Sequence, residues 1–110
     1  MKGEHLGELE ELVLLVVGSL YPEAYAPVIK KELANRMGRK VVLSSIHTVL
    51  NRLESKQFVK SMFGESTPER GGKRKRFFEI TPEGFRALEA LKSKRDALWT
   101  NMQHLIPKLS

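Results

Sequence analysis

Residues 44–56 combine an apolar helical face with an outer face of hydrogen-bonding and cationic side chains. The apolar positions recur at i, i+3, i+4 and i+7, the pattern of one buried helix face; they are Ile46, Val49, Leu50 and Leu53. Short polar groups on an exposed helix can read the edges of bases, because the DNA major groove admits one α-helix. The side chains that we assign to base contacts are Ser44, Ser45, His47, Thr48 and Asn51. Arg52 and Lys56 are assigned to phosphate contacts. By itself this face is equally compatible with a solvated helix surface.

A basic hairpin is predicted directly after this helix. Residues 58–64 and 75–80 have the composition of strands, and the connection between them is rich in turn residues. Gly71 and Gly72 allow the backbone to turn sharply and to approach a phosphate or the minor groove. The cations that can make charge-assisted contacts there are Arg70, Lys73, Arg74, Lys75 and Arg76. Because side chains alternate along a strand, Lys75 and Phe77 share one face and Arg76 and Phe78 the other. The five cations therefore cannot all contact one duplex.

The net charge of +6 is concentrated in the same part of the chain. Residues 39–76 hold ten Lys/Arg and three Asp/Glu, a surplus of +7, whereas the rest holds nine basic and ten acidic residues, or −1. A run of Lys and Arg is often only a solvated surface. Its coincidence with an exposed helix face and a hairpin turn favours a polyanion as the partner. Double-stranded DNA is the polyanion that this combination predicts.

Two further helices are predicted before this segment. The first spans residues 7–20, and the second ends at Gly38, a typical C-terminal stop. Residues 39–43 form an extended link that we expect to be a short strand, and Ser44 or Ser45 is suited to cap the next helix. The order of elements is that of a winged helix-turn-helix.

The last predicted helix is long for so small a domain. It begins at Thr81, a good N-cap followed by proline, and runs to about Leu105, before Pro107. Its apolar stripe is wider than one end of a winged-helix core can cover, which favours pairing with a second copy of the chain. A helix folded back over its own domain is the alternative. The expected dimer interface consists of Leu88, Leu91, Leu98, Trp99, Met102 and Leu105.

The predicted fold class is therefore mainly α with a small β-hairpin, a winged helix-turn-helix with a long C-terminal dimerisation helix. We divide the chain into a DNA-binding part, residues 1–80, and the dimerisation helix, residues 81–110, as one compact unit. No cysteine is present, which excludes disulfides and thiolate metal sites. We expect no cofactor and no metal. The sequence contains no catalytic motif that we could identify, so we do not expect an enzyme. It also has no signal peptide and no apolar run long enough to span a bilayer, and we expect a cytoplasmic protein.

Four segments resemble the PadR-like family of transcriptional regulators, in the right order and at the right separations; they are residues 6–15, 23–25, 48–54 and 68–84. The last one, PERGGKRKRFFEITPEG, is similar to the family's wing running into its C-terminal helix. The resemblance implies operator DNA bound by a homodimer, in most members as a repressor. In some members it implies release of DNA when a small aromatic or hydrophobic effector binds. Trp99 is then either a dimer-core aromatic or, by analogy with such members, a stacking platform for a flat effector.

The chain departs from the family pattern at three places. His47 stands where a tyrosine is common, Gln57 where a glycine usually ends the helix, and Ala26-Pro27 where a glycine usually follows Tyr25. Other functions also remain open: a winged-helix module that binds protein, an architectural DNA binder without sequence preference, and, more remotely, an RNA-binding protein. RNA modules offer exposed aromatics for base stacking, and Phe63, Phe77 and Phe78 could partly serve.

Overall fold

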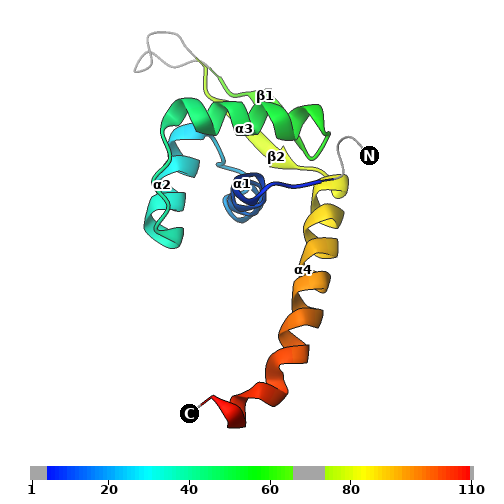
Figure 1. Ribbon diagram of the computed structural model, residues 1–110. Helices are drawn as coiled ribbons and strands as arrows, with labels where there is room; N and C mark the ends of the chain where they lie inside the picture. Colours follow the sequence, from blue (N-terminus) through cyan, green and yellow to red (C-terminus); the bar gives the residue numbers. More distant parts are fainter. Residues whose placement is uncertain (1–4, 66–73, 110) are drawn as a thin grey trace.

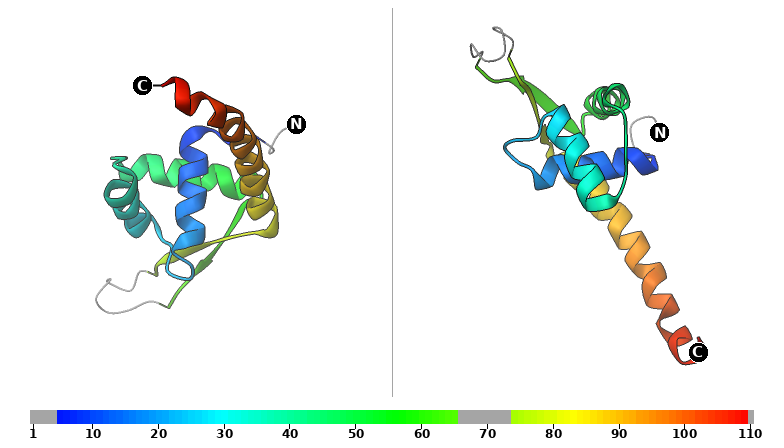
Figure 2. Two further views of the ribbon diagram at one scale, coloured as in Figure 1. Left: turned by 90° about the horizontal axis from the view of Figure 1, so that it is seen from below. Right: turned by 90° about the vertical axis from the view of Figure 1, so that its left-hand side faces the viewer.

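The computed structural model describes residues 5–65 and 74–109, and it has the winged helix-turn-helix architecture predicted from the sequence (Figure 1). The elements in chain order are α1 (Glu8–Ser19), α2 (Ala26–Met37), α3 (Leu43–Ser55), β1 (Val59–Phe63), β2 (Arg76–Ile80), α4 (Pro82–Met102) and the 3₁₀ helix η2 (Gln103–Lys108). Three helices and the hairpin form a body, and α4 leaves that body as a single rod (Figures 1 and 2). The principal dimensions of the molecule are 61 × 33 × 21 Å.

The core of the body lies where α1, α2 and α3 meet the hairpin. The apolar stripe of α3 is buried as its spacing predicts, and it packs with residues of the other elements in one cluster. The largest fully buried side chains are Phe78, Leu14, Ile29, Leu33, Ile46, Leu50, Leu53, Val13, Val17 and Val59. Burying a Leu, Ile, Val or Phe side chain contributes about 1.5–3 kcal/mol each, so this cluster is the principal apolar contribution to the stability of the body.

The hairpin is antiparallel, with Val59 opposite Ile80, Ser61 opposite Phe78 and Phe63 opposite Arg76. These six residues share the face that meets the core, because directly opposite residues point the same way. The other face carries Phe77, whose ring lies edge-on against the Tyr25 ring with centroids 5.6 Å apart. The predicted alternation between Phe77 and Phe78 is therefore confirmed.

The link between α2 and α3 differs from the sequence expectation. Gly38 ends α2 in the left-handed conformation, as predicted, but residues 39–42 pair with no strand among the described residues. At the outer edge of β2, the Phe78 N–H donates to the carbonyl of Ala24, 2.9 Å away. The segment before α2 therefore contacts this edge of the hairpin.

The start of α3 also differs from the expectation. The helix begins at Leu43 with Val42 as its N-cap, and no side chain caps it. Ser44 and Ser45 therefore lie inside the first turn. Ser45 donates its backbone N–H to the carbonyl of Val42, 3.0 Å away, so the backbone itself closes the turn.

The root of α4 is held closely against the hairpin. The Oγ1 of Thr81 accepts a hydrogen bond from the Gly84 N–H at 3.0 Å, which confirms the predicted N-cap, and donates to the Gln57 carbonyl at 2.7 Å. A Cβ built on Gly84 would overlap the carbonyl oxygen of Phe58, so only glycine fits this contact. From this root α4 extends away from the body and is not folded back over it (Figure 2).

The α-helical part of α4 ends at Met102, and the chain continues as the 3₁₀ helix η2 from Gln103, two residues before the predicted helix end at Leu105. Pro107 lies inside η2 and has no N–H to donate, and a proline ring clashes with the carbonyl four residues earlier in an α-helix. A 3₁₀ turn is a common end for an α-helix. No helix within residues 5–65 and 74–109 is both long and apolar enough to cross a bilayer.

Candidate nucleic-acid interface

The outer face of α3 presents its polar side chains to solvent at the end of the molecule opposite η2 (Figure 1). Ser44, His47, Thr48, Asn51 and Arg52 are exposed, and Ser45 is half-buried. The opposite face of the helix is buried in the core, which fixes the rotation of the helix about its axis. The hydroxyl of Thr48 donates to the Ser44 carbonyl at 3.0 Å, so its proton is engaged while its lone pairs remain available. The α3 residues assigned to base contacts thus lie on one accessible side.

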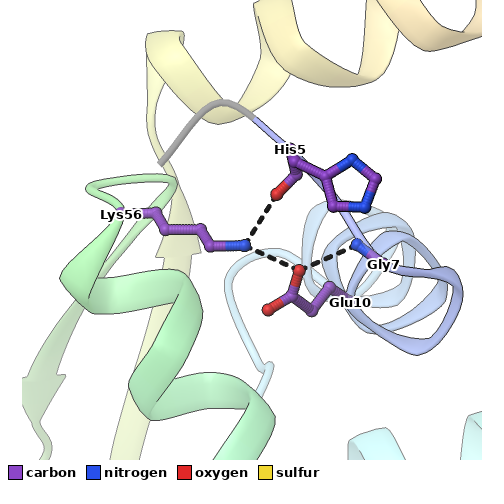
Figure 3. A network of polar contacts seen from close by, with 4 residues as sticks. All are labelled: His5, Gly7, Glu10 and Lys56. Atoms are coloured by element: carbon purple, nitrogen blue, oxygen red, sulfur yellow. Dashed lines mark hydrogen bonds and ion pairs between the residues drawn. The ribbon is translucent and has the colours of Figure 1, made fainter. Parts of the chain in front are cut away.

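Lys56 is placed differently from the sequence expectation. Its Nζ donates to the Oε1 of Glu10 at 2.8 Å and to the carbonyl of His5 at 2.6 Å, and its side chain is 22% exposed (Figure 3). The ammonium therefore faces the start of α1, and its predicted phosphate contact stays a prediction. Lys56 follows the last residue of α3, and this end of the helix lies beside the first turn of α1.

The carboxyl of Glu10 is shaped by this contact. Burial raises the pKa of Glu10. The hydrogen bonds from Lys56 and from the Gly7 N–H, together with the positive charges of Lys56 and Arg52, lower this pKa by more than burial raises it. The net effect is a pKa below the ordinary value. Glu10 is thus a buried carboxylate that stays ionised because its neighbours donate to it.

The cations at the root of the wing each lie against an aromatic ring. The Arg74 guanidinium lies 5.0 Å from the centre of the Phe63 ring, and the Lys75 ammonium lies 4.6 Å from that of Tyr25. Such cation–π contacts orient a long side chain that would otherwise sample many rotamers. Arg74 is exposed and Lys75 is half-buried. Arg70 and Lys73 lie outside the described residues.

Arg76 is paired with a carboxylate of its own chain, and its predicted DNA contact stays a prediction. Its guanidinium donates to the Oε1 of Glu54 at 2.6 Å and lies 4.9 Å from the centre of the Phe78 ring. Ser61 donates to the other oxygen of Glu54 at 2.7 Å. Because side chains alternate along a strand, Arg76 is on the face of β2 that meets α3, and it therefore links the hairpin to this helix.

Sequence reasoning missed the partners of these cations. Tyr25 and Glu54 lie in segments that resemble the family, but their contacts with these cations depend on the way that α2 and α3 meet the hairpin. For a different ion pair the sequence did contain a signal: Arg95 takes a position in α4 where its apolar stripe predicts an apolar residue. The structure shows the reason: Arg95 makes two contacts with Glu11 of α1, at 2.9 and 2.7 Å.

The residues predicted for a dimer interface fall into a half-buried group and an exposed group. Leu88 is half-buried and packs against the core of its own body, and Leu91 and Leu105 are also half-buried. Leu98, Trp99 and Met102 are exposed, with Trp99 at 63%. Trp99 also lines a groove of about 610 Å³ between α1 and α4, together with Leu15, Phe85 and Leu88. A large apolar surface on α4 is thus left uncovered by the described chain.

The family model of the PadR-like transcriptional regulators matches residues 13–90. The chain belongs to the PadR-like family. A PadR-like transcription factor from Bacteroides fragilis is similar in structure, with a TM-score of 0.72 and 24% identity over 88% of each chain. A PadR family regulator from Eggerthella lenta has a TM-score of 0.67 and 27% identity over 90% of this chain and 86% of its own.

A third PadR-like structure was solved with nucleic acid. Bacillus subtilis PadR in complex with operator DNA has a TM-score of 0.65 and 16% identity, over 76% of this chain and 46% of its own length. At this identity the likeness concerns the fold. No curated protein matches the chain.

Proposed function

We propose that this PadR-like regulator binds double-stranded DNA with sequence preference, through α3 in the major groove and the wing on the adjacent backbone. The observation that carries the proposal is the position of the exposed polar face of α3 beside the cationic root of the wing. DNA binding by the PadR of Bacillus subtilis, which shares the fold, supports it. A DNA partner is consistent with a cytoplasmic location and with a regulator that has no enzymatic activity.

The two elements have different tasks in this proposal. Side chains of α3 such as Asn51, which can pair with adenine through two hydrogen bonds, supply sequence preference. Arg52 and Arg74 supply phosphate contacts, which fix the register of the protein but carry no sequence information. Arg70, Lys73 and Lys75 are proposed as further backbone contacts. Lys56 and Arg76 are left out of the contacting set, because their cationic groups are engaged by Glu10 and Glu54.

We further propose that the protein acts as a homodimer joined through α4. Leu98, Trp99 and Met102 are exposed in the isolated chain, and exposed apolar surface of this extent marks an interaction site. A second copy is the economical partner, since a two-fold dimer also matches the symmetry of palindromic operators. We also propose a flat effector beside Trp99, because the groove there combines the apolar side chains of Leu15, Phe85, Leu88 and Trp99 with charged ones from α1 and α4. Repression is the expected sign of regulation.

Fluorescence anisotropy with labelled duplexes tests the DNA-binding proposal. One duplex comes from the region upstream of the protein's own gene and the other is a scrambled control, each at two salt concentrations. We expect tighter binding to the first duplex and a log–log salt slope of about −0.9 for each phosphate contact. Equal binding to both duplexes indicates an architectural binder or a regulator whose operator lies elsewhere. No binding at low salt contradicts the proposal and indicates a module that binds protein.

Two variants separate base reading from backbone contact. Asn51→Ala is expected to weaken the preferred duplex by about tenfold or more while changing the scrambled duplex little, since one good bidentate pair discriminates by roughly 1–3 kcal/mol. Arg74→Ala is expected to weaken binding to both duplexes about equally. It is also expected to reduce the magnitude of the salt slope by about 0.9, the value for one phosphate contact. If Asn51→Ala leaves the ratio of the two affinities unchanged, Asn51 does not read a base.

A further inference from the structure

Two consecutive carboxylates in the first turn of α1 tie this helix to two different parts of the molecule. Successive residues of a helix point about 100° apart, so Glu10 faces the end of α3 and Glu11 faces the middle of α4. Each carboxylate side chain is only 10% exposed. Each is paired with a cation of another element: Glu10 with Lys56, and Glu11 with Arg95.

The first pair also holds the segment that precedes α1. The Lys56 ammonium donates both to Glu10 and to the His5 carbonyl, and the same oxygen of Glu10 accepts the Gly7 N–H at 2.9 Å (Figure 3). His5 and Leu6 in turn lie against α4, where they line a small groove with Ala87, Ala90 and Leu91. The segment from His5 to Gly7 therefore touches both the end of the recognition helix and the root of α4.

The second pair is the outermost polar tie between α4 and the body. Arg95 reaches Glu11 with two nitrogens, at 2.9 and 2.7 Å. Beyond Leu91, the other hydrogen bonds and ion pairs of α4 in the described part of the chain stay within α4 and η2. The direction in which α4 leaves the body is therefore set at its root and at Arg95.

Stability alone does not account for the two ion pairs at this junction. The Lys56 side chain is 22% exposed, and replacing such a largely buried pair by apolar residues of similar volume is often neutral or stabilising. The Arg95 side chain is 56% exposed, and an ion pair with an exposed cation contributes little to stability. Apolar contacts tolerate sliding and rotation, but a guanidinium that grips a carboxylate with two nitrogens has a defined geometry. What the pairs add to this junction is a defined angle between α3, α1 and α4.

We propose that Glu10–Lys56 and Glu11–Arg95 are positioning pairs that set the half-site spacing accepted by the DNA-bound dimer. The inference rests on the proposed function, because it requires a dimer joined through α4 that reads DNA with α3. In such a dimer the separation of the two α3 helices depends on the angle at which each α4 leaves its body. With α4 fixed in the dimer, a rotation of the body at α1 displaces and turns α3. One base-pair step of B-DNA is about 3.4 Å, so such a rotation changes the preferred spacing.

The test begins with the wild-type protein and a pool of random duplexes, from which it selects its site. Palindromic duplexes are then made with the selected half-sites separated in steps of one base pair around one helical turn, and affinities are measured by anisotropy. The wild type is expected to prefer one separation over its neighbours by about tenfold or more, since dimer geometry sets half-site spacing. The variant Glu10→Gln/Lys56→Met keeps the oxygen that accepts the Gly7 N–H but removes both charges. Its affinities are expected to lie within about threefold of one another across the series.

A half-site duplex distinguishes positioning from direct contact. If Lys56 acts through geometry, the double variant binds an isolated half-site within about twofold of the wild type and with the same salt slope. A weaker half-site complex with a slope reduced by about 0.9 places Lys56 on a phosphate and overturns the proposal. A spacing profile as sharp as that of the wild type also overturns it.

A second variant and a control complete the design. Glu11→Gln/Arg95→Met removes the other pair and is expected to flatten the profile independently, so the proposal stays testable if the first variant unfolds. Lys92→Met/Asp96→Asn removes an exposed pair within α4, 2.7 Å long, and is expected to keep the wild-type profile. Sedimentation of each variant verifies that it remains a dimer. Failure of the proposed function itself has a separate signature, because the wild type then selects no site or sediments as a monomer.

Discussion

The body and α4 differ in how their apolar and charged side chains are covered or paired. In the body, one cluster of apolar side chains is buried, and four cations near α3 and the hairpin are engaged by partners: Arg76 by Glu54, Lys56 by Glu10, and Arg74 and Lys75 by aromatic rings. On α4, Leu98, Trp99 and Met102 are exposed, and beyond Leu91 one ion pair, Arg95 with Glu11, joins the helix to the body in the described chain. The cations around α3 and the hairpin are thus held by contacts within the body, whereas the apolar surface of α4 is left open in the described chain.

The joint between these two regions is expected to be the most sensitive position. Gly84→Ala places a Cβ against the carbonyl oxygen of Phe58 and against Ile80, so the root of α4 has to shift. We expect a loss of about 3 kcal/mol in the free energy of unfolding, at the upper end of overpacking effects. Urea denaturation measures it. Gly7→Ala is the control, since the nearest atom to its Cβ is a flexible carboxylate oxygen at 3.7 Å. Equal stability of Gly84→Ala and the wild type contradicts the proposed rigidity of this joint.

The apolar surface of α4 is expected to give the next largest effect. Trp99→Ala removes an exposed aromatic ring from the proposed interface and is expected to weaken the dimer by about 2 kcal/mol, or roughly 30-fold. Analytical ultracentrifugation at several concentrations measures the dissociation constant. Ser93→Ala, on the opposite side of α4 from the stripe, is the matched control and is expected to leave association unchanged. If Trp99→Ala leaves the dissociation constant of the dimer unchanged, the interface lies elsewhere on the molecule.

The ionised state of Glu10 predicts how the body responds to acid. Its pKa is lower in the folded protein than in the unfolded chain, so its contribution to stability is fully present above the ordinary value and disappears as the pH falls through the folded value. Melting temperatures of the wild type and Glu10→Gln are measured from pH 7 downward. We expect the wild type to be the more stable at pH 7 and the difference to shrink at acidic pH. Other carboxylates titrate in both proteins, so a difference that stays constant with pH would mean that Glu10 is not the titrating group.

The smallest expected effect is at the end of the recognition helix. Gln57 adopts φ = 66°, a left-handed conformation that costs a side chain with a Cβ roughly 1–2 kcal/mol. Gln57→Gly removes this strain but loses more entropy on folding, and we expect a net stabilisation of about 0.5 kcal/mol in urea denaturation. Ser55→Gly, two residues earlier and inside α3, is expected to destabilise instead by roughly 1 kcal/mol. If both variants destabilise, the strain at Gln57 is compensated by its side chain.

Local patterns predicted most of the elements for identifiable reasons. The apolar spacing of α3, the Thr81 cap followed by proline, the Gly38 stop and the strand alternation around Phe77 each depend on neighbours within a few residues. The predicted cap of α3 and the expected strand at 39–43 were wrong. The start of α3 is local, because the backbone carbonyl of Val42 accepts from Ser45 and closes the first turn without a side-chain cap. The edge of β2 is decided across the fold, where Phe78 donates to Ala24 and residues 39–42 pair with no described strand.

The amino-acid sequence by itself determined the order of the elements, the polar face of α3, the basic hairpin and the apolar stripe of α4, because these follow from residue type and periodicity. Only the tertiary structure decided which cations face outward. Lys56 and Arg76 look like Arg52 and Arg74 in the sequence, but Glu10 lies 46 residues from Lys56 and Glu54 lies 22 residues from Arg76. An ion pair between distant residues is decided by the packing of the elements that carry them, and no local pattern contains that information.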